Sequence, residues 1–220
     1  MSTVKLIYVE GNIGTGKTTF VSILSTILPK KNIAIVLEPV DQWMSIKDAE
    51  GNNLLSEFYK NQVKFAFPFQ MNSFISRVNV ITQTIKENPD LEYLIVERSV
   101  FTDKKCFADT CHETGKMNDI EFNIYNQWHS WLVTEFNLKP HGFIYLKTEP
   151  EVSHSRIVKR LRPGEESIPM DYLTLLHNKH NNWLETEDNV LTIDATLDFT
   201  DMSNGLMTAY VNQIMDKFID

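Results

Sequence analysis

The first apolar run of the chain leads directly into Gly11-Asn12-Ile13-Gly14-Thr15-Gly16-Lys17-Thr18. This segment matches the pattern G-x-x-x-x-G-K-[ST], and it follows a strand-like run at 6–9 and precedes a helix-like segment at 18–28, as the pattern requires. Its glycines let successive backbone N–H groups point at phosphate oxygens, and the following helix adds the positive end of its dipole. Lys17 supplies a charge to the outer phosphates, and the Thr18 hydroxyl suits Mg²⁺. The segment therefore predicts a phosphate-binding loop.

Short apolar runs recur along the rest of the chain, separated by longer segments with helical spacing. The strand-like runs are 6–9, 33–37, 93–96, 143–146 and 190–193, and the helix-like segments include 18–28, 119–136 and 170–187. Continuous apolar strands that alternate with helices are typical of a parallel sheet covered on both faces. We therefore expect an α/β fold, and the length of 220 residues fits one domain over 1–220.

Composition narrows the classes of partner. The chain has 29 Asp and Glu against 21 Lys and Arg, a net charge of −8 that gives no basic surface for nucleic acid. Its two cysteines, Cys106 and Cys111, are too few for a disulfide framework or a four-cysteine zinc site. No secretory signal and no apolar run of membrane-spanning length is visible. We expect a cytoplasmic protein with no nucleic-acid or membrane partner.

Charged residues follow two of the expected strands. Glu38-Pro39 follows the second strand, and Glu97-Arg98-Ser99 follows the third. The carboxyl ends of parallel strands form the edge where ligands of open α/β folds bind. We therefore expect these residues to lie beside the phosphate-binding loop.

Taken together, the motifs closely resemble those of the deoxyribonucleoside kinase family, which includes deoxycytidine, deoxyguanosine and insect deoxynucleoside kinases. The resembling segments cover about residues 5–200, and they are 11–18, Glu38-Pro39-Val40 with Trp43, Phe69-Gln70 through Ser76-Arg77, Glu97-Arg98-Ser99 with Asp103, and 156–165 with Ile168-Pro169. The resemblance implies a P-loop NTPase-type three-layer fold with a five-stranded parallel sheet, an arginine-rich lid at about 156–169, and a homodimer. It also implies ATP with Mg²⁺ as phosphate donor and a deoxynucleoside as acceptor.

The resemblance also implies roles for the charged residues. Glu38 would be the base for the 5′-hydroxyl, and Arg98 would hold Glu38 and neutralise charge on the transferring phosphoryl group. Glu97 would hold Mg²⁺ together with Thr18. The ATP-binding residues would be those of the loop through Thr19, with the lid residues Arg156, Arg160 and Arg162.

Aromatic residues and one amide would form the nucleoside pocket. By resemblance, Gln70 pairs with the base edge, Phe69 and Phe107 sandwich the base, and Trp43 adds a wall. Tyr59 and Glu165 match positions that bind the sugar 3′-hydroxyl. Pro163-Gly164 departs from the pattern of several family members, so the sugar contact falls to Glu165 or to Glu166, with Glu165 the better match.

Arg77 and Asp103 bear on the choice of base. In thymidine-accepting members of the family, the corresponding positions are smaller and apolar. Asp103 can accept a hydrogen bond from the exocyclic amine of cytosine or adenine, and Arg77 can donate to the O6/N7 edge of guanine. We therefore expect purine deoxynucleosides, deoxycytidine, or both, to be preferred to thymidine. An ordinary ion pair between two helices is the alternative.

Two other functions remain open. A nucleoside monophosphate kinase of the thymidylate type shares this fold, but it needs a basic residue near the second strand for the acceptor phosphate. Here Glu38-Pro39 is followed by Val40-Asp41-Gln42-Trp43, which favours an uncharged acceptor. A catalytically silent nucleotide-binding protein is the second alternative, and the presence of Lys17, Glu38 and Arg98 together speaks against it.

Overall fold

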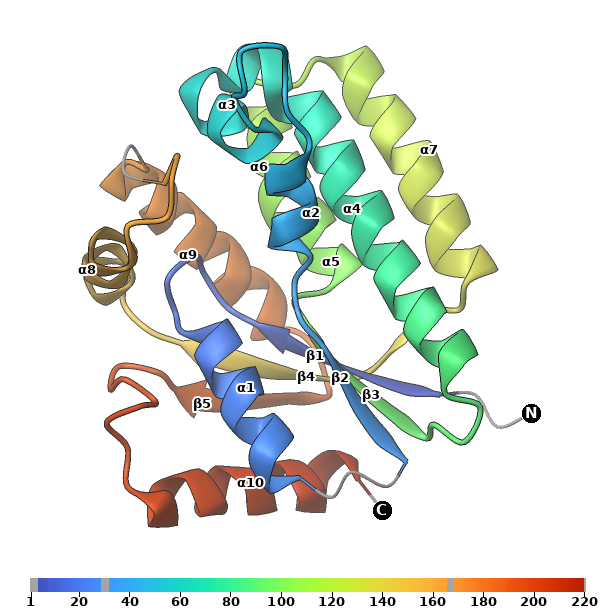
Figure 1. Ribbon diagram of the computed structural model, residues 1–220, viewed down its shortest axis with the longest axis vertical. Coiled ribbons are helices and arrows are strands. Elements are labelled where there is room, and N and C mark those ends of the chain that lie inside the picture. The colour runs from blue at the N-terminus through green and yellow to red at the C-terminus, as the bar shows by residue number, and fades with distance from the viewer. Residues whose placement is uncertain (1–3, 29–31, 166–167, 220) are drawn as a thin grey trace.

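A computed structural model describes residues 4–28, 32–165 and 168–219. In these residues, five parallel strands form one sheet in the order β2-β3-β1-β4-β5 (Figure 1). The strands are β1 (Lys5–Glu10), β2 (Ile33–Val36), β3 (Tyr93–Glu97), β4 (Pro140–Lys147) and β5 (Val190–Asp194). The expected α/β fold with a five-stranded parallel sheet is confirmed, and every strand-like run of the sequence contributes a strand.

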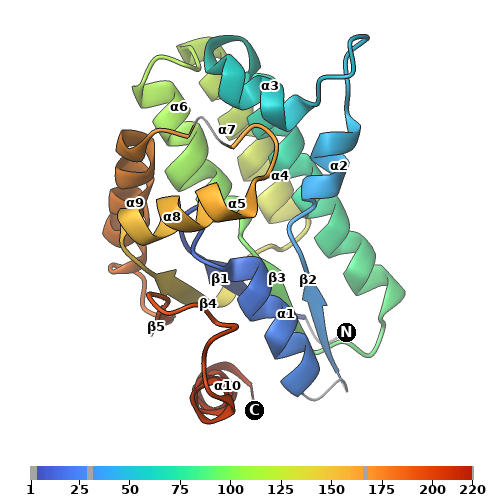
Figure 2. The same ribbon diagram turned by 60° about the vertical axis from the view of Figure 1, so that its left-hand side comes forward.

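Helices cover both faces of the sheet and complete three layers. They are α1 (Lys17–Ile27), α2 (Val40–Ser45), α3 (Leu54–Lys60), α4 (Gln62–Glu87), α5 (Val100–Thr102), the π-helix η1 (Asp103–Ala108), α6 (Asp109–Glu113), α7 (Asp119–Glu135), α8 (Pro150–Arg160), α9 (Met170–Leu184) and α10 (Asn204–Phe218). Helices α1 and α10 lie on one face, and α4, α7 and α9 lie on the other (Figures 1 and 2). None of these helices combines the length and apolar composition that crossing a membrane requires.

The central strand β1 explains the layering. Alternate side chains of a strand point to opposite faces, so Leu6 and Tyr8 join the core under α4 and α9, and Ile7 and Val9 join the core under α1 and α10. All four side chains are at most 2% exposed. A strand buried on both faces requires an unbroken apolar run, which is the pattern that the sequence shows.

Some element ends differ from the expected ones. Helix α9 ends at Leu184, three residues before the expected end at 187, because the Thr186 amide donates to the Trp183 carbonyl in a tighter final turn. The sequence predicts a helix over 69–86, whereas α4 already begins at Gln62. Asn61 caps that earlier start by accepting from the Lys64 amide, and Pro68 is accommodated inside the helix.

The contact between α10 and β4 tests the packing of the sheet. A Cβ atom added to Gly142 would lie 2.7 Å from Phe218 Cδ1, so an alanine side chain requires the ring to move. We predict that Gly142→Ala lowers the free energy of unfolding by about 1–3 kcal/mol, measured by urea denaturation. At Gly205 the nearest atom to such a Cβ is 4.0 Å away, and Gly205→Ala is the matched control. An unchanged stability for Gly142→Ala would contradict this packing.

Candidate active site

The phosphate-binding loop is held between neighbouring elements. Gly14 and Gly16 have φ values of 82° and 90°, which glycine adopts readily. A Cβ on Gly14 would collide with the carbonyl of Ser153 in α8. The side-chain amide of Asn12 donates to the Leu173 carbonyl at 2.8 Å and fastens the loop to α9. The loop is therefore shaped before any ligand binds.

Lys17 lies across this loop. Its Nζ donates to the carbonyl oxygens of Gly11 at 3.0 Å and Asn12 at 2.7 Å. Burial, and next the Arg98 guanidinium, together lower the pKa of Lys17 to about 7, against the opposing effect of Glu38 and Glu97. A phosphate in the loop would supply the negative charge that this buried ammonium group lacks.

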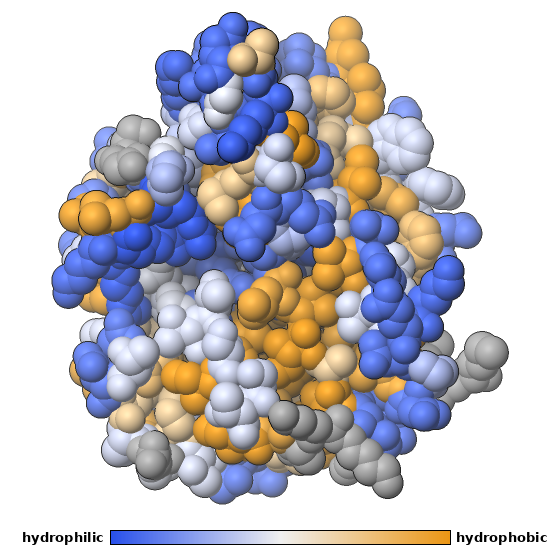
Figure 3. Space-filling view, viewed as in Figure 1, coloured by the Kyte–Doolittle hydropathy of each residue, from blue (hydrophilic) through white to orange (hydrophobic). Residues whose placement is uncertain are grey.

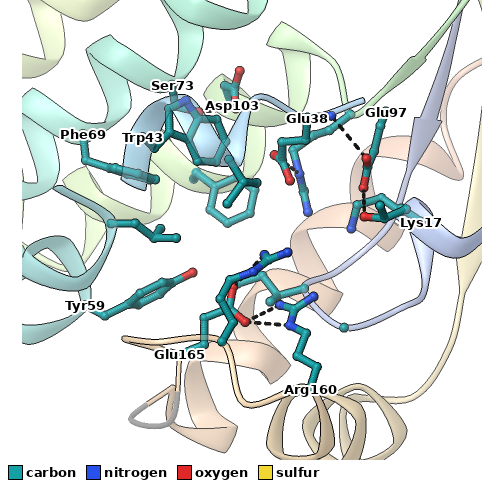
Figure 4. A pocket seen from close by; sticks show the side chains of 18 of the residues that line it. Lys17, Glu38, Trp43, Tyr59, Phe69, Ser73, Glu97, Asp103, Arg160 and Glu165 are labelled. Carbon is teal, nitrogen blue, oxygen red and sulfur yellow. Dashed lines mark hydrogen bonds and ion pairs between the residues drawn. The ribbon is translucent and has the colours of Figure 1, made fainter. Parts of the chain in front are cut away.

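A cavity of about 230 Å³ begins at the loop and runs under α3, α4 and the segment after α8. The predicted site residues that line it are Ile13, Gly14, Gly16, Lys17, Thr18, Thr19, Glu38, Trp43, Tyr59, Phe69, Gln70, Glu97, Arg98, Asp103, Phe107, Arg160, Arg162 and Glu165. Three other loop residues, Gly11, Asn12 and Thr15, are buried beside it. Residues from segments far apart in the sequence thus meet around one space (Figure 4).

The ends of β2 and β3 meet beside the loop. Thr18 Oγ1 donates to Glu97 Oε1 at 2.6 Å, and the Glu38 amide donates to Glu97 Oε2 at 3.2 Å. The predicted proximity of Thr18 and Glu97 is therefore present. A hydroxyl and a carboxylate next to a phosphate loop match the oxygen ligands that Mg²⁺ takes when substrate phosphates and water complete its shell.

Glu38 is held by two arginines. Its Oε1 accepts from Arg77 Nη2 at 2.9 Å and from Arg98 Nε at 3.1 Å. Burial by itself would raise the pKa of Glu38, but Arg98, Arg77 and Lys17 together hold it down at about 2. The carboxylate is therefore ionised and fixed in place. Its predicted contact with Arg98 is present, and its contact with Arg77 was not expected from the sequence.

The turn after β3 has a strained residue and an additional buried acid. Arg98 has φ of 63°, a left-handed conformation that is unusual for a non-glycine residue. Glu10, fully buried, accepts from the Ser99 amide at 3.0 Å and from the Thr102 hydroxyl. Burial raises the pKa of Glu10, whereas the hydrogen bonds from Ser99 and Thr102 lower it. Sequence reasoning missed Glu10, although a charged residue ending a buried strand just before the loop is a usable signal.

Aromatic side chains form the opposite end of the cavity. The rings of Trp43 and Phe69 meet edge to face with centroids 5.4 Å apart, and Phe58 stacks behind Phe69 at 4.5 Å. Trp43 Nε1 donates to Ser76 Oγ at 2.8 Å, which fixes the indole. Figure 4 shows Trp43 and Phe69 on one side of the cavity and Tyr59 on another. A flat ring of nucleobase size fits such walls.

Asp103 and Arg77 have different positions in the site. Arg77 is 1% exposed, and its Nε and Nη2 donate to the two carboxylate oxygens of Asp103 at 2.8 and 3.2 Å. Its Nη1 donates to the Glu97 carbonyl at 3.1 Å. The guanidinium therefore lies behind Asp103 with its donors directed at protein groups, and Asp103 lines the cavity. The structure does not place Arg77 as a direct contact for guanine.

The three arginines of the expected lid have different partners. Arg160 Nε donates to Glu165 Oε2 at 2.8 Å, and Arg162 Nη1 donates to Glu165 Oε1 at 3.1 Å. Arg156 is turned elsewhere and donates to the carbonyls of Thr15, Ala195 and Thr196. Residues 156–160, the first part of the expected lid, belong to helix α8, and Glu166 lies outside the described residues.

Glu165 and Tyr59 face the cavity near each other (Figure 4). Burial raises the pKa of the Tyr59 hydroxyl, and the charge of Glu165 raises it further. The phenol therefore stays protonated and able to donate, while the carboxylate accepts. A sugar hydroxyl, which both donates and accepts, is complementary to this pair.

The fold and this cavity define a P-loop kinase with a pocket for a small acceptor beside its phosphate loop. Comparison with known proteins gives the family: the model for deoxynucleoside kinase matches residues 7–220, and the chain belongs to the deoxynucleoside kinase family. It is therefore an enzyme that phosphorylates nucleosides. The resemblance noted from the sequence motifs is confirmed.

Individual relatives agree with this family. A probable deoxycytidine kinase of Fowlpox virus (strain NVSL) is 38% identical over 210 residues, covering 93% of this chain and 84% of the viral one. Deoxycytidine kinase of Rattus norvegicus is 33% identical over 232 residues, covering 93% and 88% of the two chains. A mitochondrial deoxyguanosine kinase of Xenopus laevis is 34% identical over 197 residues, covering 82% and 73%.

Proposed function

We propose that this kinase uses ATP with Mg²⁺ to phosphorylate the 5′-hydroxyl of deoxynucleosides, and that it prefers purine deoxynucleosides, deoxycytidine, or both, to thymidine. The observation that carries the proposal is the position of Glu38 in one cavity, between the phosphate-binding loop and the aromatic walls. The whole chain, residues 1–220, would act as one kinase domain, with 156–169 as its lid.

In this proposal, the base enters between Trp43, Phe69 and Phe107, and the sugar 3′-hydroxyl binds Tyr59 and Glu165. The 5′-hydroxyl then lies near Glu38, which accepts its proton. A carboxylate with so low a pKa is a weak base, but the loose transition state of phosphoryl transfer requires little proton removal before the new bond forms. The main contribution of Glu38 is therefore to orient the hydroxyl.

The donor phosphates would lie against the loop amides and Lys17. Mg²⁺, held by Thr18 and Glu97, would neutralise charge on the outer phosphates. Arg98 stabilises the transferring phosphoryl group, and Arg160 and Arg162 close over it and exclude water. Arg156 was predicted to bind phosphate as well. Its bonds to three backbone carbonyls support a different role, in which it fixes α8 to the loop.

A monophosphate kinase of the thymidylate type is less well supported. The acceptor phosphate of such an enzyme needs a cation on the acceptor side of the cavity. The cations that line the described cavity are Lys17, Arg98, Arg160 and Arg162, and they contact the phosphate loop, Glu38 or Glu165. An uncharged acceptor therefore fits better.

Glu38 provides the decisive test of the mechanism. We predict that Glu38→Gln lowers turnover by about 10²-fold or more and leaves nucleoside affinity roughly unchanged, because the lost interaction acts mainly in the transition state. Steady-state rates with deoxycytidine and deoxyguanosine, together with calorimetric nucleoside binding, measure the two effects. Glu50→Gln, in an exposed turn, is the control. A correctly folded Glu38→Gln enzyme with most of its turnover would remove Glu38 from the mechanism.

The pair formed by Arg77 and Asp103 tests base preference. We predict that the double variant Arg77→Met/Asp103→Ala raises thymidine activity relative to deoxycytidine and deoxyadenosine, because it removes a charged pair and makes room for the 5-methyl group. Arg77→Met alone should cost about 3–5 kcal/mol of stability, because it leaves the buried carboxylate of Asp103 without its arginine and removes one of the two arginines that hold Glu38. Specificity constants for deoxyadenosine, deoxyguanosine, deoxycytidine and thymidine measure the base preference, and urea denaturation measures the loss of stability. A wild-type enzyme equally efficient with thymidine would contradict the preference.

We also propose that the enzyme is a homodimer joined through α7. Ile120, Ile124, Trp128 and Trp131 follow one another at helical spacing and are 38–73% exposed. Ile75 on the neighbouring α4 is 45% exposed. Figure 3 shows apolar side chains gathered along the edge of the molecule that α7 forms. A second copy of the same face, related by a two-fold axis, would cover them.

Sedimentation measures this association. We predict that Trp131→Glu shifts the enzyme from dimer to monomer, because a charge is placed in an apolar contact, and that Ile27→Glu on α1 leaves the dimer intact. Ile27 is a matched control because it is also exposed and apolar. A wild-type enzyme that sediments as a monomer at micromolar concentration would overturn the proposed dimer.

A further inference from the structure

Gln70, a buried polar side chain of the proposed nucleoside pocket, has a sulfur partner. Its side-chain Nε2 donates to Cys111 Sγ at 4.0 Å. Gln70 is 1% exposed and lines the cavity, and Cys111 is 2% exposed. A thiol sulfur is a weak acceptor, so this contact is a soft constraint on the amide. Nothing in the mechanism described above uses it.

The position of Cys111 orients the amide. Helix α4 runs against the continuous helical segment formed by α5, η1 and α6, so that Gln70 meets Cys111 while Ser73 and Arg77 meet Asp103. Cys111 comes eight residues after Asp103, about two helical turns further along that segment. Because the nitrogen of the Gln70 amide contacts Cys111, the oxygen on the other branch of the planar group is directed away from Cys111 and toward the Asp103 end of the pocket.

This order selects between two kinds of base edge. Cytosine and adenine present an exocyclic amine, which donates, beside a ring nitrogen, which accepts. Uracil, hypoxanthine and guanine present the reverse order, a carbonyl that accepts beside a ring N–H that donates. With Asp103 and the Gln70 oxygen on one side and the Gln70 nitrogen on the other, the pocket matches an amine followed by a ring acceptor.

We propose that Cys111 is a positioning residue that determines base specificity: its thiol accepts from Gln70 and holds the amide in the orientation that pairs with cytosine and adenine. The inference rests on the proposed nucleoside kinase function and deepens it. It assigns part of the base preference to a residue that does not itself contact the base. Asp103 accepts a hydrogen bond from the exocyclic amine of the base, and Cys111 acts on the base only through Gln70.

The chemistry of the thiol is consistent with this role. Burial raises the pKa of Cys111 to about 12, and the hydrogen bond from Gln70 opposes that rise only in part. The sulfur is therefore neutral at physiological pH and adds no charge to the pocket. A neutral hydrogen bond changes an equilibrium by a moderate factor, so loss of the contact should weaken discrimination without abolishing catalysis.

Two pairs of substrates isolate the orientation of the amide. Deoxycytidine and deoxyuridine have the same size and differ in the base edge that faces Gln70, where one has an amine and the other a carbonyl. Deoxyadenosine and deoxyinosine differ in the same way. We expect Cys111→Ala and Cys111→Val to lower the ratio of specificity constants within each pair by about threefold to tenfold. Cys111→Ser, whose hydroxyl accepts a hydrogen bond, should keep the ratio near the wild-type value. Cys106→Ala, at the other buried thiol, is the matched control and should leave the ratio unchanged.

The outcomes are separable. If Cys111→Ala and Cys111→Val slow both members of each pair equally, or if Cys111→Ser loses discrimination as they do, Cys111 has only a structural role and the inference is wrong. If the wild-type enzyme phosphorylates none of the four nucleosides, the proposed function fails instead. A wild-type enzyme that prefers deoxyuridine to deoxycytidine would overturn the assigned orientation, because the amide would then face the other way.

Discussion

The site depends on one buried cation. Arg77 lies inside α4 with 1% of its surface exposed, and a guanidinium group in that position must be paired. It is paired with Asp103 on η1, with Glu38 after β2, and with the carbonyl of Glu97 at the end of β3. Asp103 and Glu38 therefore share a partner, and one planar group fixes their separation. In the proposed function, this side chain would place the base, beside Asp103, relative to the attacking 5′-hydroxyl, beside Glu38.

Much of the fold could be predicted because burial leaves a pattern in the sequence. Strands such as β1 are covered on both faces, and this requirement produces their continuous apolar runs. The edge strands β2 and β5 are less buried, but each still has an apolar run that locates it. The phosphate-binding loop is equally local, since its glycines and Lys17 lie within eight residues. Helix ends were less predictable. The last turn of α9 is decided by which carbonyl the Thr186 amide contacts, and the start of α4 by the side chain of Asn61.

The sequence predicted which residues line the cavity better than it predicted which of their atoms make contact. Motif spacing brings Glu38, Glu97 and Gln70 to one cavity, because strand ends and one helix face converge there. Spacing does not say which atoms meet. The bond between Arg77 and Glu38 and the position of Arg156 depend on contacts across the fold that leave no periodic signal. The π-helix η1 has the same origin, since its widened turn is visible only in the backbone hydrogen bonds.

The bonds of Arg156 have a consequence for how the sequence can vary. Its guanidinium contacts backbone oxygens of Thr15, Ala195 and Thr196, and every residue type carries such an oxygen. The connection between α8, the loop and the segment after β5 therefore makes no demand on which side chains stand at those three positions. The exposed position 196 can therefore change, and with it the surface that it presents, while a single arginine keeps the framework joined; Ala195 is restricted only by its own burial in the core under α1 and α10.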